Sequence, residues 1–261
     1  MCPPAQTARG GVLEHDSTPS NRARRPSRRR VFGEGGPAMT FTGGVGHLVL
    51  SVAAFLGAHS LSNWKPLRGP IEARYGKAGF YAGYSVVSTI LLVWVIAAAL
   101  NSPTVVVWEQ QPWMRWVPPL VMPVACLFWM LGLSQKNPFS IGPGGAGYDP
   151  ARPGIVRLTR HPIIWGLGLW SAAHILPNGH LAGLLLFVPL LLLCLVGPRI
   201  LDAKRRKSLG DRHWREMAER AVFEPRALLA ELGWARICGG LALYPVLLWL
   251  HPMVIGLSPL P

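Results

Sequence analysis

The chain has 261 residues, of which 50% are hydrophobic and only 15% are charged, and its formal net charge is +14 at pH 7. This composition is too apolar for an ordinary soluble domain, and the charges lie between apolar blocks rather than opposite apolar stripes. We therefore expect the basic excess to flank a membrane, and we predict no nucleic-acid partner. The predicted fold class is all-α, a polytopic integral membrane helical bundle.

The first 38 residues differ from the rest of the chain. They include SNRARRPSRRR, several glycines and prolines, and no apolar run. This composition is typical of a disordered basic tail. Two interpretations stay open: these residues are a transit-like targeting extension, or the start codon was assigned too early and translation begins at Met39. In both, residues 39–261 are expected to form the transmembrane domain.

Apolar segments follow one another along the rest of the chain. They run from about 41 to 64, 79 to 100, 116 to 133, 161 to 177, 180 to 196 and 237 to 250. A bilayer crossing needs about 20 residues, so each segment is of spanning length once helix ends and tilt are included. Pro177-Asn178-Gly179 predicts a tight turn between the fourth and fifth segments. The sequence therefore predicts about six transmembrane helices.

Basic residues alternate from loop to loop. Lysines and arginines gather after the first, third and fifth apolar segments, whereas the other loops hold only Arg115. Because cytoplasmic loops carry the basic excess, these three loops are expected inside the cell and both ends of the domain outside. A basic tail would then lie outside too, which favours the start at Met39. The segment DAKRRKSLGDRHWREMAER is expected on the cytoplasmic surface, with Trp214 at headgroup depth.

Histidines inside membrane segments are costly and are functional-site candidates by default. A rise of about 1.5 Å per residue separates His47 from His59 by about 18 Å, and His161 from His174 by slightly more. Two layers result because the helices alternate in direction: His59 and His161 at one depth, and His47, His174, His180 and His251 at the other. Histidines from different helices could ligate haem or a metal; alternatively, each lies at a helix end bonded to backbone or headgroups.

The segments GAHSLSNWKPLR, RYGKAGFYAGYS, RHPIIWGLGLWSAAHILPNGH, LDAKRRK and HPMVIGLSPLP resemble the NnrU family in order and spacing, over roughly residues 44–261. This family comprises bacterial membrane proteins linked to nitrite and nitric oxide reduction, and it is related to the zeta-carotene isomerase of plants and cyanobacteria. The resemblance implies haem b, with His174 as the first candidate ligand and His59 and His161 as further candidates. It also implies a multi-pass protein of the bacterial inner (plasma) membrane, with nitrogen-oxide reductase components as partners and denitrification or redox-gated isomerisation as the activity.

The family resemblance and the depth of each histidine in the membrane predict different residues as the second haem ligand beside His174. The resemblance favours His59, whose GAHS setting of small residues would let a macrocycle approach the backbone. Depth favours His47 or His251, because straight helices place His59 about 18 Å away along the bundle. The isomerase branch also has a cysteine three residues before its key histidine, and this chain has Ser171 there.

A second resemblance belongs to another class of protein. RHP followed by Gly166, and the later LGDRHWREMAE, are similar to the RHPxYxG region of membrane methyltransferases of the isoprenylcysteine and phospholipid type. Those enzymes bind S-adenosylmethionine near this motif. Here Trp165 occupies the tyrosine position, and Asp202 stands in place of paired glutamates. Whether the protein is an enzyme is left open, with the methyltransferase as the alternative to a haem protein.

Overall fold

The structure is a computed structural model that describes residues 44–61 and 64–261. Its helices are α1 (Val45–Leu61), α2 (Lys65–Leu100), α3 (Val117–Ser134), α4 (Pro162–Ile175), α5 (Leu181–Leu209), α6 (Asp211–Glu219), α7 (Pro225–Leu232) and α8 (Trp234–Ile255), with 3₁₀ turns η1 (Pro112–Trp116) and η2 (Gly154–Arg157). Strands are absent from the described residues, apart from one isolated bridge between Val106 and His180. The all-α prediction is confirmed, whereas the predicted tail at 1–38 lies outside the described residues.

Each predicted apolar segment contains a helix, but the helices differ in length. Four of those in the described chain are long and apolar enough to cross a membrane: α2, η1 with α3, α5 and α8. By contrast, α1 has 17 residues and α4 only 14, fewer than the roughly 20 that one crossing needs. By length and composition the structure therefore supports four spans, and not the full predicted count of six.

Two helices extend beyond the apolar segments that predicted them. α2 begins at Lys65, where the sequence predicted a basic loop, and it is broken at Gly76, with φ +71° and ψ 170°. This backbone conformation is open mainly to glycine, so Gly76 joins a polar helical segment to the apolar one at a kink. α5 continues past Val196 through the basic cluster to Leu209. Much of the basic charge predicted for loops therefore lies on helical extensions.

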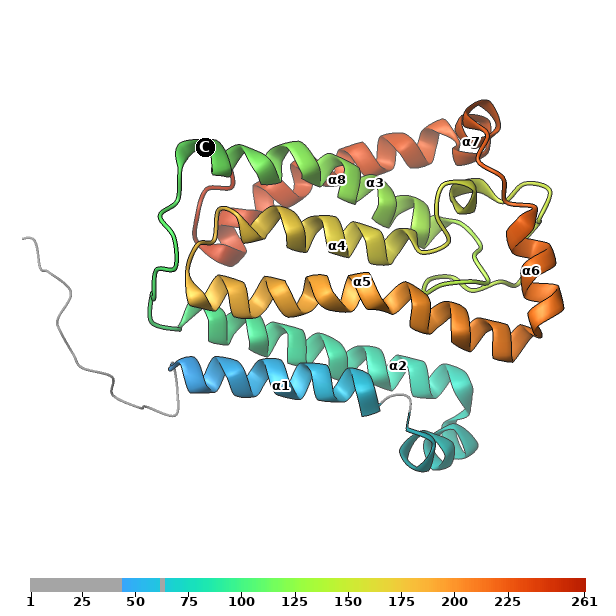
Figure 1. The fold of residues 1–261 in the computed structure, drawn as a ribbon, viewed down its shortest axis with the longest axis horizontal. Helices are drawn as coiled ribbons and strands as arrows, with labels where there is room; N and C mark the ends of the chain where they lie inside the picture. Colours follow the sequence, from blue (N-terminus) through green and yellow to red (C-terminus); the bar gives the residue numbers. More distant parts are fainter. Residues whose placement is uncertain (1–43, 62–63) are drawn as a thin grey trace, which may run out of the picture. The chain divides into compact units, whose positions relative to one another are not determined.

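α4 lies in the interior of the bundle, between its neighbours α3 and α5 (Figure 1). α1 and α2 pack against each other and against α5, while α4 lies between α5 and α3, and α3 also packs on α8. Glycines permit these close approaches: a Cβ at Gly166 would lie 2.6 Å from the Trp129 ring of α3. A Cβ at Gly168 would lie 3.2 Å from Cys194 of α5. Small residues of this kind let membrane helices pack closely.

Hydrogen bonds tie the turn between α4 and α5 to the segment that precedes α3. The backbone nitrogens of Val107 and Trp108 donate to the carbonyl of Gly179 at 2.8 and 3.0 Å. The Trp108 indole also donates to the carbonyl of Leu176 at 3.0 Å. The predicted turn at 177–179 is therefore present, and it fixes the end of α4 that carries His174.

Candidate functional site

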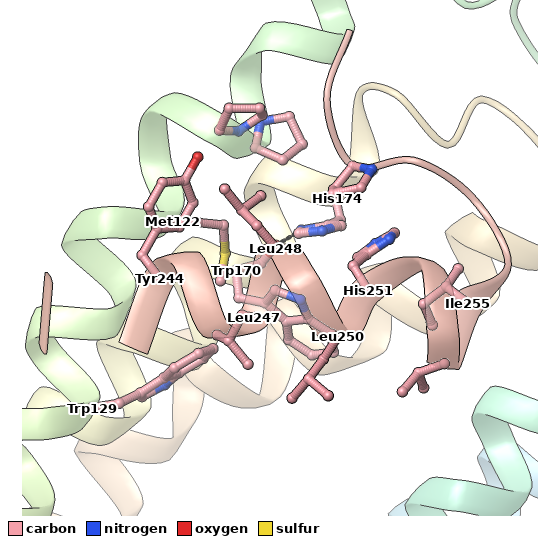
Figure 2. Close-up of a pocket in the computed structure, with 14 residues that line it drawn as sticks. Met122, Trp129, Trp170, His174, Tyr244, Leu247, Leu248, Leu250, His251 and Ile255 are labelled. Atoms are coloured by element: carbon pink, nitrogen blue, oxygen red, sulfur yellow. Dashed lines mark hydrogen bonds between the residues drawn. The ribbon is translucent and has the colours of Figure 1, made fainter. Parts of the chain in front are cut away.

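A cavity of about 350 Å³ lies among α3, α4 and α8 (Figure 2). We call it the His174 pocket; it is lined by Pro118, Pro119, Met122, Trp129, Trp170, His174, Tyr244, Leu247, Leu248, Leu250, His251, Val254, Ile255 and Pro259. Its volume is within the range of about 300 to 1,000 Å³ that is usual for ligand and cofactor sites. The walls are mostly apolar, and the polar side-chain groups are two imidazoles, one phenol and two indoles.

His174 lies in the last turn of α4. Its Nδ1 is 2.8 Å from the carbonyl oxygen of Trp170, and because a carbonyl can only accept, Nδ1 carries the proton. The imidazole also packs against the rings of Trp170 and Phe187, with centroids 5.8 and 5.3 Å away. These contacts fix the tautomer and orientation, and they leave the Nε2 lone pair available, as a metal-ligating histidine requires.

His251 approaches the same pocket from α8. Its Nδ1 donates to the carbonyl oxygen of Leu257 at 2.9 Å. This bond depends on Gly256, whose φ of +81° ends α8 and turns the chain back toward the imidazole. Figure 2 shows the imidazoles of His174 and His251 next to one another at the pocket. The structure therefore brings together two histidines from different helices, both with a protonated Nδ1.

His59, the ligand that the family resemblance favours, lies elsewhere. It is in the last turn of α1, and its Nδ1 donates to the carbonyl of Phe55 at 2.8 Å. Its ring packs against the rings of Phe55 and Tyr84, with centroids 4.3 and 5.8 Å away. His59 is not among the residues that line the His174 pocket. Haem ligation by His59 stays a prediction that this geometry does not favour.

His47, the other candidate suggested by depth, is held by a neighbouring helix. The indole nitrogen of Trp94 in α2 donates to Nε2 of His47 at 2.8 Å. This bond uses the lone pair that an iron would need, so Nδ1 carries the proton. Of the two histidines that the depth argument offered, the structure places His251 and not His47 beside His174.

His161, the third candidate, lies at the opposite end of α4 as its N-terminal cap. Its side chain is buried, and Nε2 lies 3.0 Å from a carboxylate oxygen of Asp202 while Nδ1 lies 3.0 Å from the Ser140 hydroxyl. Because a carboxylate can only accept, Nε2 carries the proton and Nδ1 accepts from Ser140. Arg160 donates to the second Asp202 oxygen at 2.9 Å. We call these four residues the His161 network; within it both ring nitrogens of His161 are engaged.

Trp214 covers this network from α6. The tryptophan is only 3% exposed, and its ring meets that of Phe139 edge-on at 5.7 Å. The guanidinium groups of Arg160 and Arg206 lie over the ring at 5.2 and 4.1 Å. α6 buries Trp214 inside the protein, so its ring is not available to contact lipid headgroups, and its depth in a membrane stays a prediction. Its aromatic partner lies 75 positions earlier in the chain, so no local pattern could have revealed the contact.

The His161 network gives the protein an acid-sensitive contact. Burial lowers the pKa of His161, while Asp202 opposes this by favouring the charged imidazolium. A depressed pKa stabilises the fold above the unfolded value of about 6.5, and that contribution is lost as the pH falls below it. We expect the thermal unfolding midpoint to decrease as the pH is lowered from about 7.5 to about 5.5. In His161→Gln the midpoint should depend less on pH over this range. A variant that kept the full pH dependence of the wild type would contradict this assignment.

Ser171 is the residue at the position where the family resemblance predicted a cysteine in the isomerase branch. Its side chain is fully buried in α4, and its hydroxyl has no hydrogen-bond partner in the part of the chain that the structure describes. Ser171 does not line the His174 pocket, although it lies one turn before His174. The pocket-lining residues include no cysteine, so the pocket offers no thiolate ligand.

Comparison with known proteins agrees with these observations. The family model described as "NnrU protein" matches residues 47–259, a range that includes all but the first two residues of α1, the whole of α2 to α8, the His174 pocket and the His161 network. No match is found among the curated proteins or among the solved structures. The four long apolar helices fit a membrane protein of the NnrU type. With more than half of its length matched, the chain belongs to the NnrU family.

Proposed function

We propose that this membrane protein binds haem b in the His174 pocket, where His174 of α4 and His251 of α8 would hold it. The observation that carries the proposal is the pair of imidazoles at one apolar cavity, each with its Nδ1 proton donated to a backbone carbonyl. A hydrogen bond from Nδ1 to a carbonyl orients a metal-ligating histidine and raises the basicity of its Nε2. When bound, haem supplies an iron that can change oxidation state, with a potential tuned by its axial ligands and surroundings.

The residues around the pocket suit a flat apolar group with acidic edges. Prolines, leucines and tryptophans form the walls, and such walls exclude water from a macrocycle. Arg115 in η1 donates to the carbonyl of Leu260, the neighbour of the pocket residue Pro259. This guanidinium is therefore bonded to the residue next to the pocket lining, and it is our candidate to pair with a haem carboxylate.

A haem suits the available donors better than a bare metal ion does. Within residues 44–61 and 64–261 no group of three or more His, Cys, Asp or Glu side chains is placed to hold a metal ion. Haem iron needs only one or two protein ligands, because the macrocycle supplies the other four. The two histidines at the His174 pocket satisfy that requirement.

The topology in this proposal has six crossings in the bacterial inner membrane. The shorter helices α1 and α4 would cross with α2, α3, α5 and α8, since they pack in the same bundle. The ends that carry Arg160, Arg205 and Arg206 would face the cytoplasm, because basic residues gather there. The His174 pocket, at the other end of α4, would then lie toward the external side.

The cellular role in this proposal is a haem-bearing redox or assembly function in nitrite and nitric oxide reduction, alongside nitrogen-oxide reductase components. Family membership supports this role. Double-bond isomerisation of the zeta-carotene type receives less support, because Ser171 replaces the cysteine and is buried away from the pocket. The methyltransferase alternative is also weaker, since Arg160 and His161 of its RHP motif are engaged with Asp202.

The ligand pair is tested by comparing His251→Ala with His59→Ala. We expect His251→Ala to lose the six-coordinate low-spin spectrum and to retain less haem, whereas His59→Ala should keep the wild-type spectrum. The haem absorbance of each purified variant is measured in reduced-minus-oxidised visible spectra, and His47→Ala is the matched control. Loss of the spectrum in His59→Ala, with His251→Ala unchanged, would show that the pocket assignment is wrong.

A further inference from the structure

A second pocket lies at the other ends of α3 and α8. It has a volume of about 410 Å³ and is lined by Ser134, Gln135, Lys136, Gly147, Tyr148, Asp149, Arg152, Pro153, Gly154, Glu231 and Arg236. We call it the polar pocket. The His174 pocket uses α3 from Pro118 to Trp129 and α8 from Tyr244 onward, whereas the polar pocket uses the end of α3 at Ser134 and the start of α8 at Arg236. The two pockets are therefore separate and unlike in chemistry.

Tertiary hydrogen bonds hold the wall of the polar pocket in place. The Gln135 side chain accepts from the backbone nitrogen of Ile155 at 2.7 Å and donates to the carbonyl of Glu231 at 3.3 Å. Glu231 accepts from the backbone nitrogen of Gly154 at 2.8 Å and forms an ion pair with Arg157 at 2.8 Å. Three segments of the chain thus meet at a defined surface, and the carboxylate of Glu231 is already neutralised.

The remaining charges at this surface are mostly positive. Lys136, Arg152 and Arg236 line the pocket, and Asp149 is the other carboxylate besides Glu231. In the described part of the chain, the side chains of Lys136 and Arg152 make no hydrogen bond or ion pair, and Arg236 bonds only to the carbonyl of Leu232 at 3.2 Å. With Glu231 neutralised by Arg157, three cations face one carboxylate. The pocket therefore has an uncompensated positive charge and free donors.

We propose that the polar pocket binds a phosphate group, with Lys136 and Arg152 as its principal donors. Guanidinium and ammonium groups are the side chains that bind phosphate best, the former through paired N–H donors. Because α3 and α8 are both long and apolar enough to span a membrane, their ends would lie near the boundary between lipid and water. A basic pocket between membrane helices at that boundary suits the headgroup of an anionic phospholipid, and free phosphate has the same chemistry. The proposal does not depend on haem binding.

The test uses the full-length protein in neutral detergent, with added dioleoyl phosphatidylglycerol, dioleoyl phosphatidylcholine or inorganic phosphate. The test variant is Lys136→Gln/Arg152→Gln. The control is Arg212→Gln/Arg215→Gln, which removes the same charge from exposed positions on α6. Binding is measured as the ligand-dependent rise of the thermal unfolding midpoint. Without ligand, both variants should unfold near the wild-type midpoint, because the replaced side chains make no buried contacts.

We expect phosphatidylglycerol, and not phosphatidylcholine, to raise the midpoint of the wild type and of the control variant. Lys136→Gln/Arg152→Gln should need about tenfold more anionic lipid for the same rise. If inorganic phosphate alone reproduces a rise that depends on Lys136 and Arg152, the pocket binds free phosphate. Equal weakening of both double variants, or no rise with either anion, would overturn the proposal, because it would show general surface charge or no site.

Discussion

Replacing His174 with alanine should remove most of the haem from the purified protein, by about tenfold or more. His174 is the pocket histidine whose orientation is most constrained, since its Nδ1 is bonded to the Trp170 carbonyl and its ring packs on Phe187. Without this imidazole, a bound haem would keep only His251 of the proposed pair, and His251 lies near the C-terminal end of α8. Haem content is measured as the pyridine haemochrome absorbance per chain.

The control for this change is His213→Ala. His213 lies exposed on α6, outside the pocket-lining residues, and its loss should leave the haem content unchanged. The local bond of His174 lies within its own helix, so the fold should survive its loss. If both variants lost haem equally, the loss would reflect general damage to the protein, and His174 would not be a ligand.

Replacing Asp202 with alanine should lower the free energy of unfolding by about 1 to 3 kcal/mol. The Nε2 proton of His161 has Asp202 as its acceptor, and the imidazole is only 3% exposed. Removal of the carboxylate leaves a buried donor unsatisfied. Arg160 also loses a partner, but its side chain is 40% exposed and is hydrated more easily, so it adds little.

Buried thiols provide the measurement for Asp202→Ala. Cys126 and Cys194 are free and buried, whereas Cys238 is exposed, so exposed thiols are first blocked with N-ethylmaleimide. A thiol-reactive fluorescent dye then labels Cys126 and Cys194 as the bundle opens during heating in detergent. The control is Glu216→Ala, which removes a carboxylate from an exposed pair with Arg212 on α6 and should shift the midpoint very little. Equal shifts in the two variants would mean that the His161 network contributes nothing beyond surface charge.

The helices were predictable because long apolar blocks separated by charged loops are typical of membrane-spanning helices. The fourth predicted segment, 161 to 177, agrees closely with α4, and the sixth lies within α8. The ends of α2 and α5 were not predictable from hydrophobicity, because both helices continue through basic residues. Composition does not oppose such extensions, since lysine and arginine are good helix formers.

The candidate site was only partly predictable, because its parts depend on tertiary contacts. His174 could be singled out by its position in an apolar helix, and the depth argument retained His251 as a partner. Placing His251 in the pocket depends on the turn at Gly256, which brings the Leu257 carbonyl to its imidazole. The His161 network joins Ser140 to Asp202 across 62 positions, and no spacing rule relates residues so far apart.

The most direct test of the haem proposal is the visible spectrum of the purified full-length protein, recorded oxidised and after reduction with dithionite. We predict a Soret band, a sharpened α-band on reduction, and about one haem b per chain in the pyridine haemochrome assay. Protein that is folded, as shown by protected Cys126 and Cys194, but has no Soret band and takes up no added haemin would contradict the proposal.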